Sequence, residues 1–132
     1  VVREPNDGYW SNVWNNDAKG WCACYWGGRP AETMMFSAAY VAESKWNDTM
    51  WKTTDSAVKF NQLVKDARKE LDESKKRDIL YECQRLIYDD GGLLCPLFNS
   101  YVSANSKKIA HGKIAANWDS DGAKCVERWW FA

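Results

Sequence analysis

The chain has 132 residues, 45% of them hydrophobic and 27% charged, which suits one compact domain or a piece of a larger one and excludes intrinsic disorder. Its 18 basic and 18 acidic side chains cancel, so a nucleic-acid partner is not expected. No apolar run in the sequence is long enough to span a membrane.

Tryptophan and cysteine are the unusual parts of the composition. Nine tryptophans suggest a pocket without naming its ligand, because a large aromatic ring is costly unless it is buried or stacked. Five cysteines cannot all pair with one another, no Cys-x-x-Cys motif is present, and the single histidine, His111, lies far from them in sequence. We therefore predict free, mostly buried thiols, with no metal site and no other cofactor.

The first part of the chain predicts a short helix and a strand. Residues 5–8, Pro-Asn-Asp-Gly, indicate a turn, and a short helix is expected over Tyr9–Trp14. A strand centred on Trp21–Tyr25 follows and ends at the glycine pair Gly27-Gly28.

The stretch Gly20–Pro30, GWCACYWGGRP, has the composition of one wall of a small-molecule pocket. Aromatic side chains provide apolar walls, glycines let a ligand approach the backbone, and arginine binds planar anions through two hydrogen bonds. An ion pair of Arg29 with Glu32 or Asp48 is an equally good interpretation of that residue. The candidate pocket residues are Trp21, Tyr25, Trp26 and Arg29.

The next segment predicts a helix and then a loop that contributes to ligand binding. Pro30 favours a helix over Ala31–Tyr40, whose buried side is expected to hold Met34, Met35, Ala38 and Ala39. The polar segment Glu43–Thr54 is expected to be a loop with one helical turn. It places Trp46 beside Asn47, and because exposed aromatic rings next to amides are typical of ligand clamps, both residues are predicted to contact a ligand at the rim of the pocket.

Two amphipathic helices are the clearest elements. The apolar stripe of Ser56–Leu71 includes Phe60, Val64 and Leu71, and a second stripe runs through Lys75–Asp89. The glycine pair Gly91-Gly92 predicts the end of the second helix. With so short a break between them, the helices should pack as a hairpin.

The last part of the chain is less regular. Leu93–Ala104 predicts a long strand, in which Pro96 is awkward because it lacks the ladder donor. The ending Trp129-Trp130-Phe131 should be buried, whereas Asp119 and Asp121 lie in a turn and are too few for a calcium site. No nucleophile has an evident base, so we predict that the chain is not an enzyme.

Several motifs in this order resemble one family. GWCACYWGGRP, ETMMFSAAY, WNDTMW, the two helices, DDGG, PLFNSYV and the ending ERWWFA resemble the C-terminal part of family 5 (cluster C) solute-binding proteins, from about Arg3 to Ala132. These are the dipeptide-, oligopeptide- and nickel-type receptors of bacterial ABC importers. The order of the motifs is more specific than any one of them.

The resemblance implies an α/β fold of the periplasmic-binding-protein type (type II), in which two lobes close over a solute. Residues 1–96 are then the C-terminal portion of the second lobe, and residues 97–132 are a crossover strand and a tail that complete the first. The implied partners are ABC permease subunits and a missing N-terminal part of the same protein. The implied location is the periplasm or the outer face of the cytoplasmic membrane.

The resemblance also implies a ligand and residues that contact it. Trp21 and Cys22 correspond to ligand-contacting positions, and Cys24 stands where oligopeptide-binding relatives have an aspartate for the peptide's amino group. A thiol cannot replace that carboxylate, so we expect a peptide-like or opine-like solute, with Arg29 as its anion partner. Two alternatives remain open, which are a small thiol-dependent enzyme or redox protein using Cys22 and Cys24, and a self-standing interaction module.

Overall fold

The computed structural model describes residues 2–16, 18 and 20–132, and it divides the chain into two compact units. The first unit comprises Val1–Tyr25 and Ala31–Leu94, and the second comprises Trp26–Pro30 and Cys95–Ala132. This division lies close to the boundary expected between residues 96 and 97, but it assigns the glycine turn at residues 26–30 to the second unit. The predicted place of each part in a two-lobed receptor stays a prediction.

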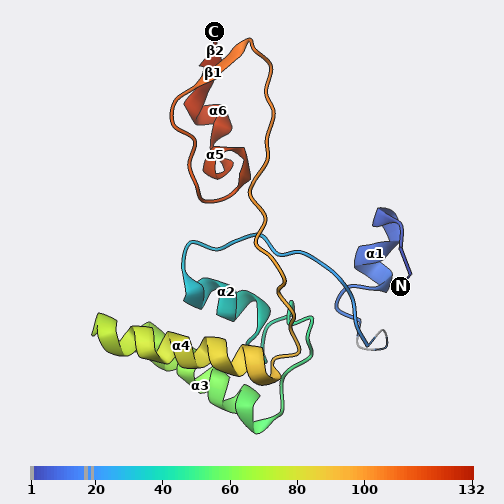
Figure 1. Cartoon of the computed structure of the whole chain (residues 1–132), viewed down its shortest axis with the longest axis vertical. Coiled ribbons are helices and arrows are strands. Elements are labelled where there is room, and N and C mark those ends of the chain that lie inside the picture. The colour runs from blue at the N-terminus through green and yellow to red at the C-terminus, as the bar shows by residue number, and fades with distance from the viewer. Residues whose placement is uncertain (1, 17, 19) are drawn as a thin grey trace. The chain divides into compact units, whose positions relative to one another are not determined.

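A helical hairpin dominates the first unit. Helices α3 (Asp55–Lys69) and α4 (Glu73–Asp90) pack against each other, as the sequence predicted (Figure 1). Asp72 caps α4 by accepting from the amides of Ser74 and Lys75, so the helix begins two residues earlier than predicted. The buried residues of the two helices are Ala57, Phe60, Val64, Ala67, Cys83, Leu86 and Ile87.

Leu71 was wrongly placed on the apolar stripe of the first of these helices. Helix α3 ends at Lys69, and Leu71 is 92% exposed in the connection that follows. The 3.6-residue pattern holds only while the helix continues, so an apolar residue beyond its end gains no buried position. At the other end of the hairpin, α4 stops at Gly91 as predicted.

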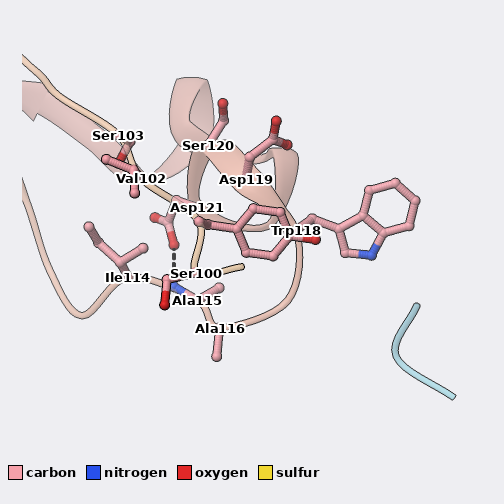
Figure 2. A pocket seen from close by; sticks show the side chains of 11 residues that line it. Ser100, Val102, Ser103, Ile114, Ala115, Ala116, Trp118, Asp119, Ser120 and Asp121 are labelled. Atoms are coloured by element: carbon pink, nitrogen blue, oxygen red, sulfur yellow. Dashed lines mark hydrogen bonds between the residues drawn. The ribbon is translucent and has the colours of Figure 1, made fainter. Parts of the chain in front are cut away.

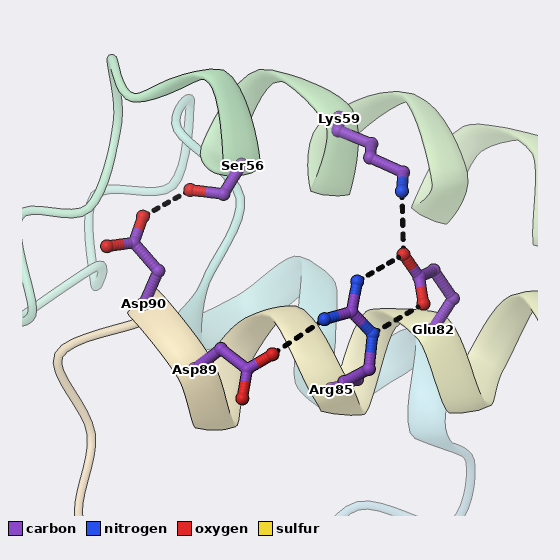
Figure 3. A network of polar contacts seen from close by, with 6 residues as sticks. All are labelled: Ser56, Lys59, Glu82, Arg85, Asp89 and Asp90. Carbon is purple, nitrogen blue, oxygen red and sulfur yellow. Dashed lines mark hydrogen bonds and ion pairs between the residues drawn. The ribbon is translucent and has the colours of Figure 1, made fainter.

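An ion-pair network crosses the outer side of the hairpin (Figure 3). Lys59 Nζ lies 2.6 Å from Glu82 Oε1, and Arg85 pairs with both Glu82 and Asp89. Arg85 and then Lys59 lower the pKa of Glu82 to about 2. The network therefore stabilises the charged form of Glu82 and joins the two helices on their solvent side.

Asp90 closes the hairpin at the end of α4. Its carboxylate accepts hydrogen bonds from the hydroxyl of Ser56, the indole of Trp51 (2.9 Å) and the hydroxyl of Thr54 (3.0 Å). Figure 3 shows Asp90 at the end of α4 reaching Ser56 at the start of α3. The three donors, Ser56 first, lower the pKa of Asp90.

Helix α2 (Glu32–Ala39) packs against α3, in the range that the sequence predicted, but its buried side is only partly the predicted one. Ala39 is buried as predicted and Phe36 is buried as well, whereas Met34 is exposed. The rings of Phe36 and Trp51 lie 5.6 Å and 5.1 Å from that of Phe60, which is fully buried. These three rings form the centre of the core. The sequence pattern of the helix did not predict that Phe36 belongs to this core.

The start of the chain is helical, but the strand expected after it does not form. Helix α1 spans Asn6–Asn12, so it begins within the predicted turn and ends before Trp14. Residues 21–25 belong to no strand, so the strand predicted at Trp21–Tyr25 was wrong. A strand needs the backbone of a neighbour, and no described segment of the chain pairs with this one.

The second unit contains a small antiparallel sheet and a tight turn. Strands β1 (Ile109–His111) and β2 (Trp129–Phe131) pair with Ala110 opposite Trp130. Between them lie α5 (Asp119–Ala123) and the four-residue helix α6 (Cys125–Arg128). Inside α5, Ser120, Asp121 and Gly122 have positive φ, a left-handed conformation that is costly for residues other than glycine.

The long strand predicted over Leu93–Ala104 does not form either. This segment has no ladder partner in the described part of the chain, and Leu94, Phe98 and Val102 are exposed. The expectation that the whole aromatic ending is buried was also wrong, because Trp130 and Phe131 are exposed and only Trp129 is half-buried. The described chain is therefore a set of helices with one two-stranded sheet, while the α/β receptor fold stays a prediction.

No helix in the described residues combines the length and the apolar character that a membrane crossing requires.

Candidate functional site

The predicted ligand-binding residues fall into both units. The first unit holds Trp21, Cys22, Cys24, Tyr25, Trp46 and Asn47, and the second holds Trp26 and Arg29.

Cys24 lies beside a carboxylate that the sequence did not place there. Its Sγ lies 3.5 Å from Asp48 Oδ2, and the indole Nε1 of Trp14 donates to the same oxygen at 2.8 Å. Desolvation and the Asp48 carboxylate raise the pKa of Cys24 to about 12. The thiol therefore stays protonated near neutral pH, which makes it a poor nucleophile.

A cluster of aromatic rings includes Tyr25, another predicted residue of the first unit. Trp10 makes edge contacts with Tyr9, Trp14 and Tyr25, with ring centroids 5.2, 5.7 and 6.0 Å apart. The hydroxyl of Tyr9 donates to the carbonyl of Ala23 at 2.6 Å and ties α1 to the extended segment. This packing accounts for one side of the segment and leaves its aromatic side chains accessible.

Trp21 and Cys22 differ in their exposure. Trp21 is 77% exposed, and Cys22 is half-buried. All five cysteines are free thiols, but Cys83 is the one that is buried, so the expectation of mostly buried thiols was wrong. Burial, followed by the neighbouring Glu82, raises the pKa of Cys83 to about 11.

Asn47 does not lie on a rim, which corrects its predicted role. The residue is fully buried, and its Nδ2 donates to the carbonyls of Tyr40, Val41 and Trp51. Its side-chain oxygen accepts from the hydroxyl of Thr49. Asn47 therefore holds the loop in shape, and its amide is already used by the backbone. The adjacent Trp46 is exposed, as a rim residue would be.

Arg29 is the predicted site residue with the most distinctive surroundings. Its Nη1 donates to the carbonyl of Gly27 at 2.7 Å, which fixes the guanidinium beside its own turn. The guanidinium carbon lies 5.2 Å from the ring centroid of Trp118 and 6.0 Å from that of Trp26. Both distances are within the range of cation–π attraction. Within the described residues Arg29 forms no ion pair, so the predicted alternative, a pair with Glu32 or Asp48, is not found.

A cavity of about 320 Å³ adjoins Arg29 within the second unit. The amide of Gly28 donates to the phenol oxygen of Tyr101 at 3.2 Å, so the hydroxyl hydrogen of Tyr101 remains available to a ligand. Asn117 and Trp118 complete the opposite part of the lining together with Ala116. The cavity thus combines an arginine, a phenol and an amide with apolar surface, which is a donor-rich lining suited to an oxyanion.

Sequence reasoning missed Tyr101 and Trp118. Tyr101 was assigned to a strand, and Trp118 lies in a segment with no regular pattern. The one sequence feature that pointed to further aromatic site residues was the composition, because nine tryptophans exceed what a small core requires. Which of them would meet Arg29 depends on contacts between distant parts of the chain.

Asp121 holds the loop that carries Trp118 (Figure 2). Its Oδ1 accepts from the backbone amide of Ala115 at 2.6 Å and pairs with Arg128 at 3.0 Å. Its Oδ2 accepts from the indole Nε1 of Trp129 at 3.0 Å. The side chain is buried, and the Ala115 amide is the main cause that lowers the pKa of Asp121. Asp121 therefore fixes the left-handed turn and the loop beside it, a role that the sequence did not indicate.

A second cavity, of about 360 Å³, lies on the same loop. It shares Tyr101, Ala116 and Trp118 with the first and extends to Asp119 and Asp121. The arrangement has donors, acceptors and aromatic faces but no nucleophile paired with a base. In the part of the chain that the structure describes, no three His, Cys, Asp or Glu side chains are grouped so that they could hold a metal ion.

The comparisons with known proteins give no relative. No protein-family model matches the sequence, and no curated protein or solved structure matches it either.

Proposed function

We propose that this chain is part of the substrate-binding component of a bacterial ABC importer and that it binds a peptide-like or opine-like solute through a carboxylate at Arg29. The observation that carries the binding role is the position of Arg29, which lines a donor-rich cavity between two indole rings. The importer, its permease subunits and the periplasmic location come from the family resemblance of the motifs.

The surroundings of Arg29 favour a planar anion. The two indole rings lie over the guanidinium, and Nη1 is already bonded to Gly27, so a ligand is left the remaining edge of the group. An in-plane edge matches the two oxygens of a carboxylate, which can accept parallel hydrogen bonds. A hydrogen bond to a charged group contributes about 1.5–3 kcal/mol. Removing it should therefore weaken binding by roughly tenfold to a hundredfold.

The exposed apolar segment supports a role within a larger assembly. Leu94, Phe98 and Val102 have apolar side chains open to solvent in the stretch whose sequence predicts a strand. Apolar groups of this size are normally covered in a mature protein or complex. The first lobe of a receptor, supplied by a preceding part of the same protein, is the partner that the resemblance implies. The affinity of these 132 residues alone should then be weak.

The alternative of a thiol-dependent enzyme has less support. A catalytic thiol needs a lowered pKa, whereas the surroundings of Cys24 raise its pKa to about 12. Rapid labelling of Cys22 or Cys24 by a thiol reagent near neutral pH, without denaturant, would favour the enzyme over the receptor.

Saturation-transfer NMR tests the proposed binding, because it detects millimolar affinity. The chain is titrated with acetate, hexanoate and an acidic dipeptide, in the original form and as Arg29→Ala. Signals from these carboxylates should fall at least tenfold in the variant. Arg77→Ala is the matched control, since Arg77 is exposed on α4, and it should change nothing. Equal signals in all three proteins would refute the binding role of Arg29.

A further inference from the structure

The two cavities of the second unit share one wall. Tyr101, Ala116 and Trp118 line both the cavity of about 320 Å³ that contains Arg29 and the cavity of about 360 Å³ that contains Asp119. A solute that passes this wall meets a guanidinium at one end and a carboxylate at the other. All the residues that make up the two cavities belong to the same unit.

We propose that the two cavities bind the two ends of one elongated zwitterionic solute, with its carboxylate at Arg29 and its ammonium group at Asp119. The inference rests on the proposed function and adds the class of substrate, a carboxylate and an amine joined by an apolar spacer. It also assigns a binding role to Asp119, which the sequence indicated only as part of a turn.

The two neighbouring carboxylates of the turn are used differently. Asp121 is buried and accepts from Ala115 and Trp129 while pairing with Arg128, so its charge is already compensated within the protein. Asp119 is exposed, lines the cavity, and makes no hydrogen bond or ion pair with any described residue. Asp119 is thus the carboxylate that a cationic group entering this cavity can reach.

The neighbour of Asp119 in the chain also suits an ammonium group. Ser120 lines the same cavity, and its hydroxyl can accept a hydrogen bond (Figure 2). An ammonium group brings three donors, of which the Asp119 carboxylate can accept at least one. A second carboxylate on the solute would instead face Asp119 with the same charge, so dicarboxylates should be rejected.

The surface between the two ends is partly apolar. Figure 2 shows Val102 and Ile114 on one side of the cavity and Trp118 with Asp119 on the other. Methylene groups of a spacer can pack against the indole of Trp118 and the methyl of Ala116, which form the shared wall. The spacer adds affinity by burial, and the charged ends set its direction.

The experiment compares ω-amino acids with monocarboxylates of equal length. The chain is titrated by NMR with ω-amino acids of four, six and eight carbons and with the corresponding fatty acids, as the original protein and as Asp119→Asn. For the amino acid that binds best, the substitution should raise the Kd about fivefold, to the value of its matched fatty acid. The Kd of the fatty acid should not change. Asp78→Asn, an exposed carboxylate of α4, serves as control and should affect neither ligand.

The outcomes separate this inference from the function on which it rests. If Arg29→Ala weakens both ligand series while Asp119→Asn weakens neither, or weakens both equally, the two-ended site is refuted and the carboxylate site stands. If Arg29→Ala has no effect on either series, the proposed function itself is refuted. Asp119→Asn should leave the circular dichroism spectrum unchanged, because the residue has no partner among the described residues.

Discussion

The helical hairpin of the first unit and the turn-rich second unit are stabilised in different ways. The hairpin has a continuous apolar core around Phe60, capped helix ends and an ion-pair network on its outer side. The second unit buries few apolar groups, and the carboxylate of Asp121 joins its loop, its α6 helix and its β2 strand. The hairpin is thus stabilised mainly by burial and the second unit mainly by one polar centre.

This difference explains where a binding site can form. A well-packed apolar core leaves no space for a solute and no free donors, because its elements satisfy one another. Loops held by a single buried carboxylate can present aromatic faces and donors to a cavity. Trp118 and Tyr101 do so, because they line both cavities of the second unit. The candidate site accordingly lies in the unit with the smaller core.

The largest expected effect is on the hairpin core. Phe60→Ala removes a fully buried ring that contacts Phe36 and Trp51, and such a change costs about 3–5 kcal/mol of unfolding free energy. Urea denaturation followed by circular dichroism at 222 nm measures it. Val58→Ala, at an exposed position of the same helix, should stay within about 0.5 kcal/mol of the original protein. Similar losses for both variants would contradict the assigned core.

The end of the second helix provides a smaller test of the hairpin. A Cβ at Gly91 would lie 2.6 Å from the carbonyl oxygen of Ile87, a backbone atom that cannot easily move. Gly91→Ala should therefore destabilise the hairpin by about 1–3 kcal/mol. Gly112→Ala in the second unit, where a Cβ meets no atom within 4 Å, is the matched control and should be close to neutral.

A local effect is expected from the polar centre of the second unit. Asp121→Asn keeps the size of the side chain but places an amide donor where Trp129 or Arg128 now donates. Amide hydrogen exchange in β1 and β2 should become faster, while exchange in α3 and α4 stays the same. Equal acceleration in both units would show that the contrast between them is wrong, and Asp119→Asn is the control for the change of charge.

The smallest effect is the pH dependence of the outer ion pairs. Arg85 and Lys59 lower the pKa of Glu82 from its ordinary value of 4.5 to about 2 in the folded protein. A lowered folded pKa adds stability above pH 4.5, which is lost as the pH falls from about 4.5 to 2. Melting temperatures across this range should fall less steeply for Glu82→Gln than for the original protein. An unchanged slope would mean that solvent screens the pairs completely.

The sequence predicted the elements whose signals are local. It predicted most of the apolar stripes of α3 and α4, the end of α4 at Gly91 and the range of α2. Each of these features depends on residues within a few turns of one another. The start of α4 was placed two residues too late because the capping role of the Asp72 side chain was not recognised.

The strands and the site depended on contacts that no local pattern contains. Trp21–Tyr25 and Leu93–Ala104 have the composition of strands, but a strand forms only where a partner supplies the ladder. Gly28 meets Tyr101 across a separation of 73 residues, so the sequence identified Arg29 without the aromatic residues around it. Asn47 was misassigned because the sequence of a polar loop does not show whether an amide side chain faces solvent or bonds to the backbone.

Central to this account is the claim that the guanidinium of Arg29 binds a carboxylate. The most direct measurement is the Nε–H resonance of Arg29 in a ¹⁵N-labelled chain during a titration with hexanoate, with that of Arg77 as the reference. We predict a saturable shift for Arg29 and none for Arg77, because Arg29 lines the cavity and Arg77 is exposed on α4. Equal shifts of the two resonances, or no shift of Arg29 at millimolar hexanoate, would contradict the account.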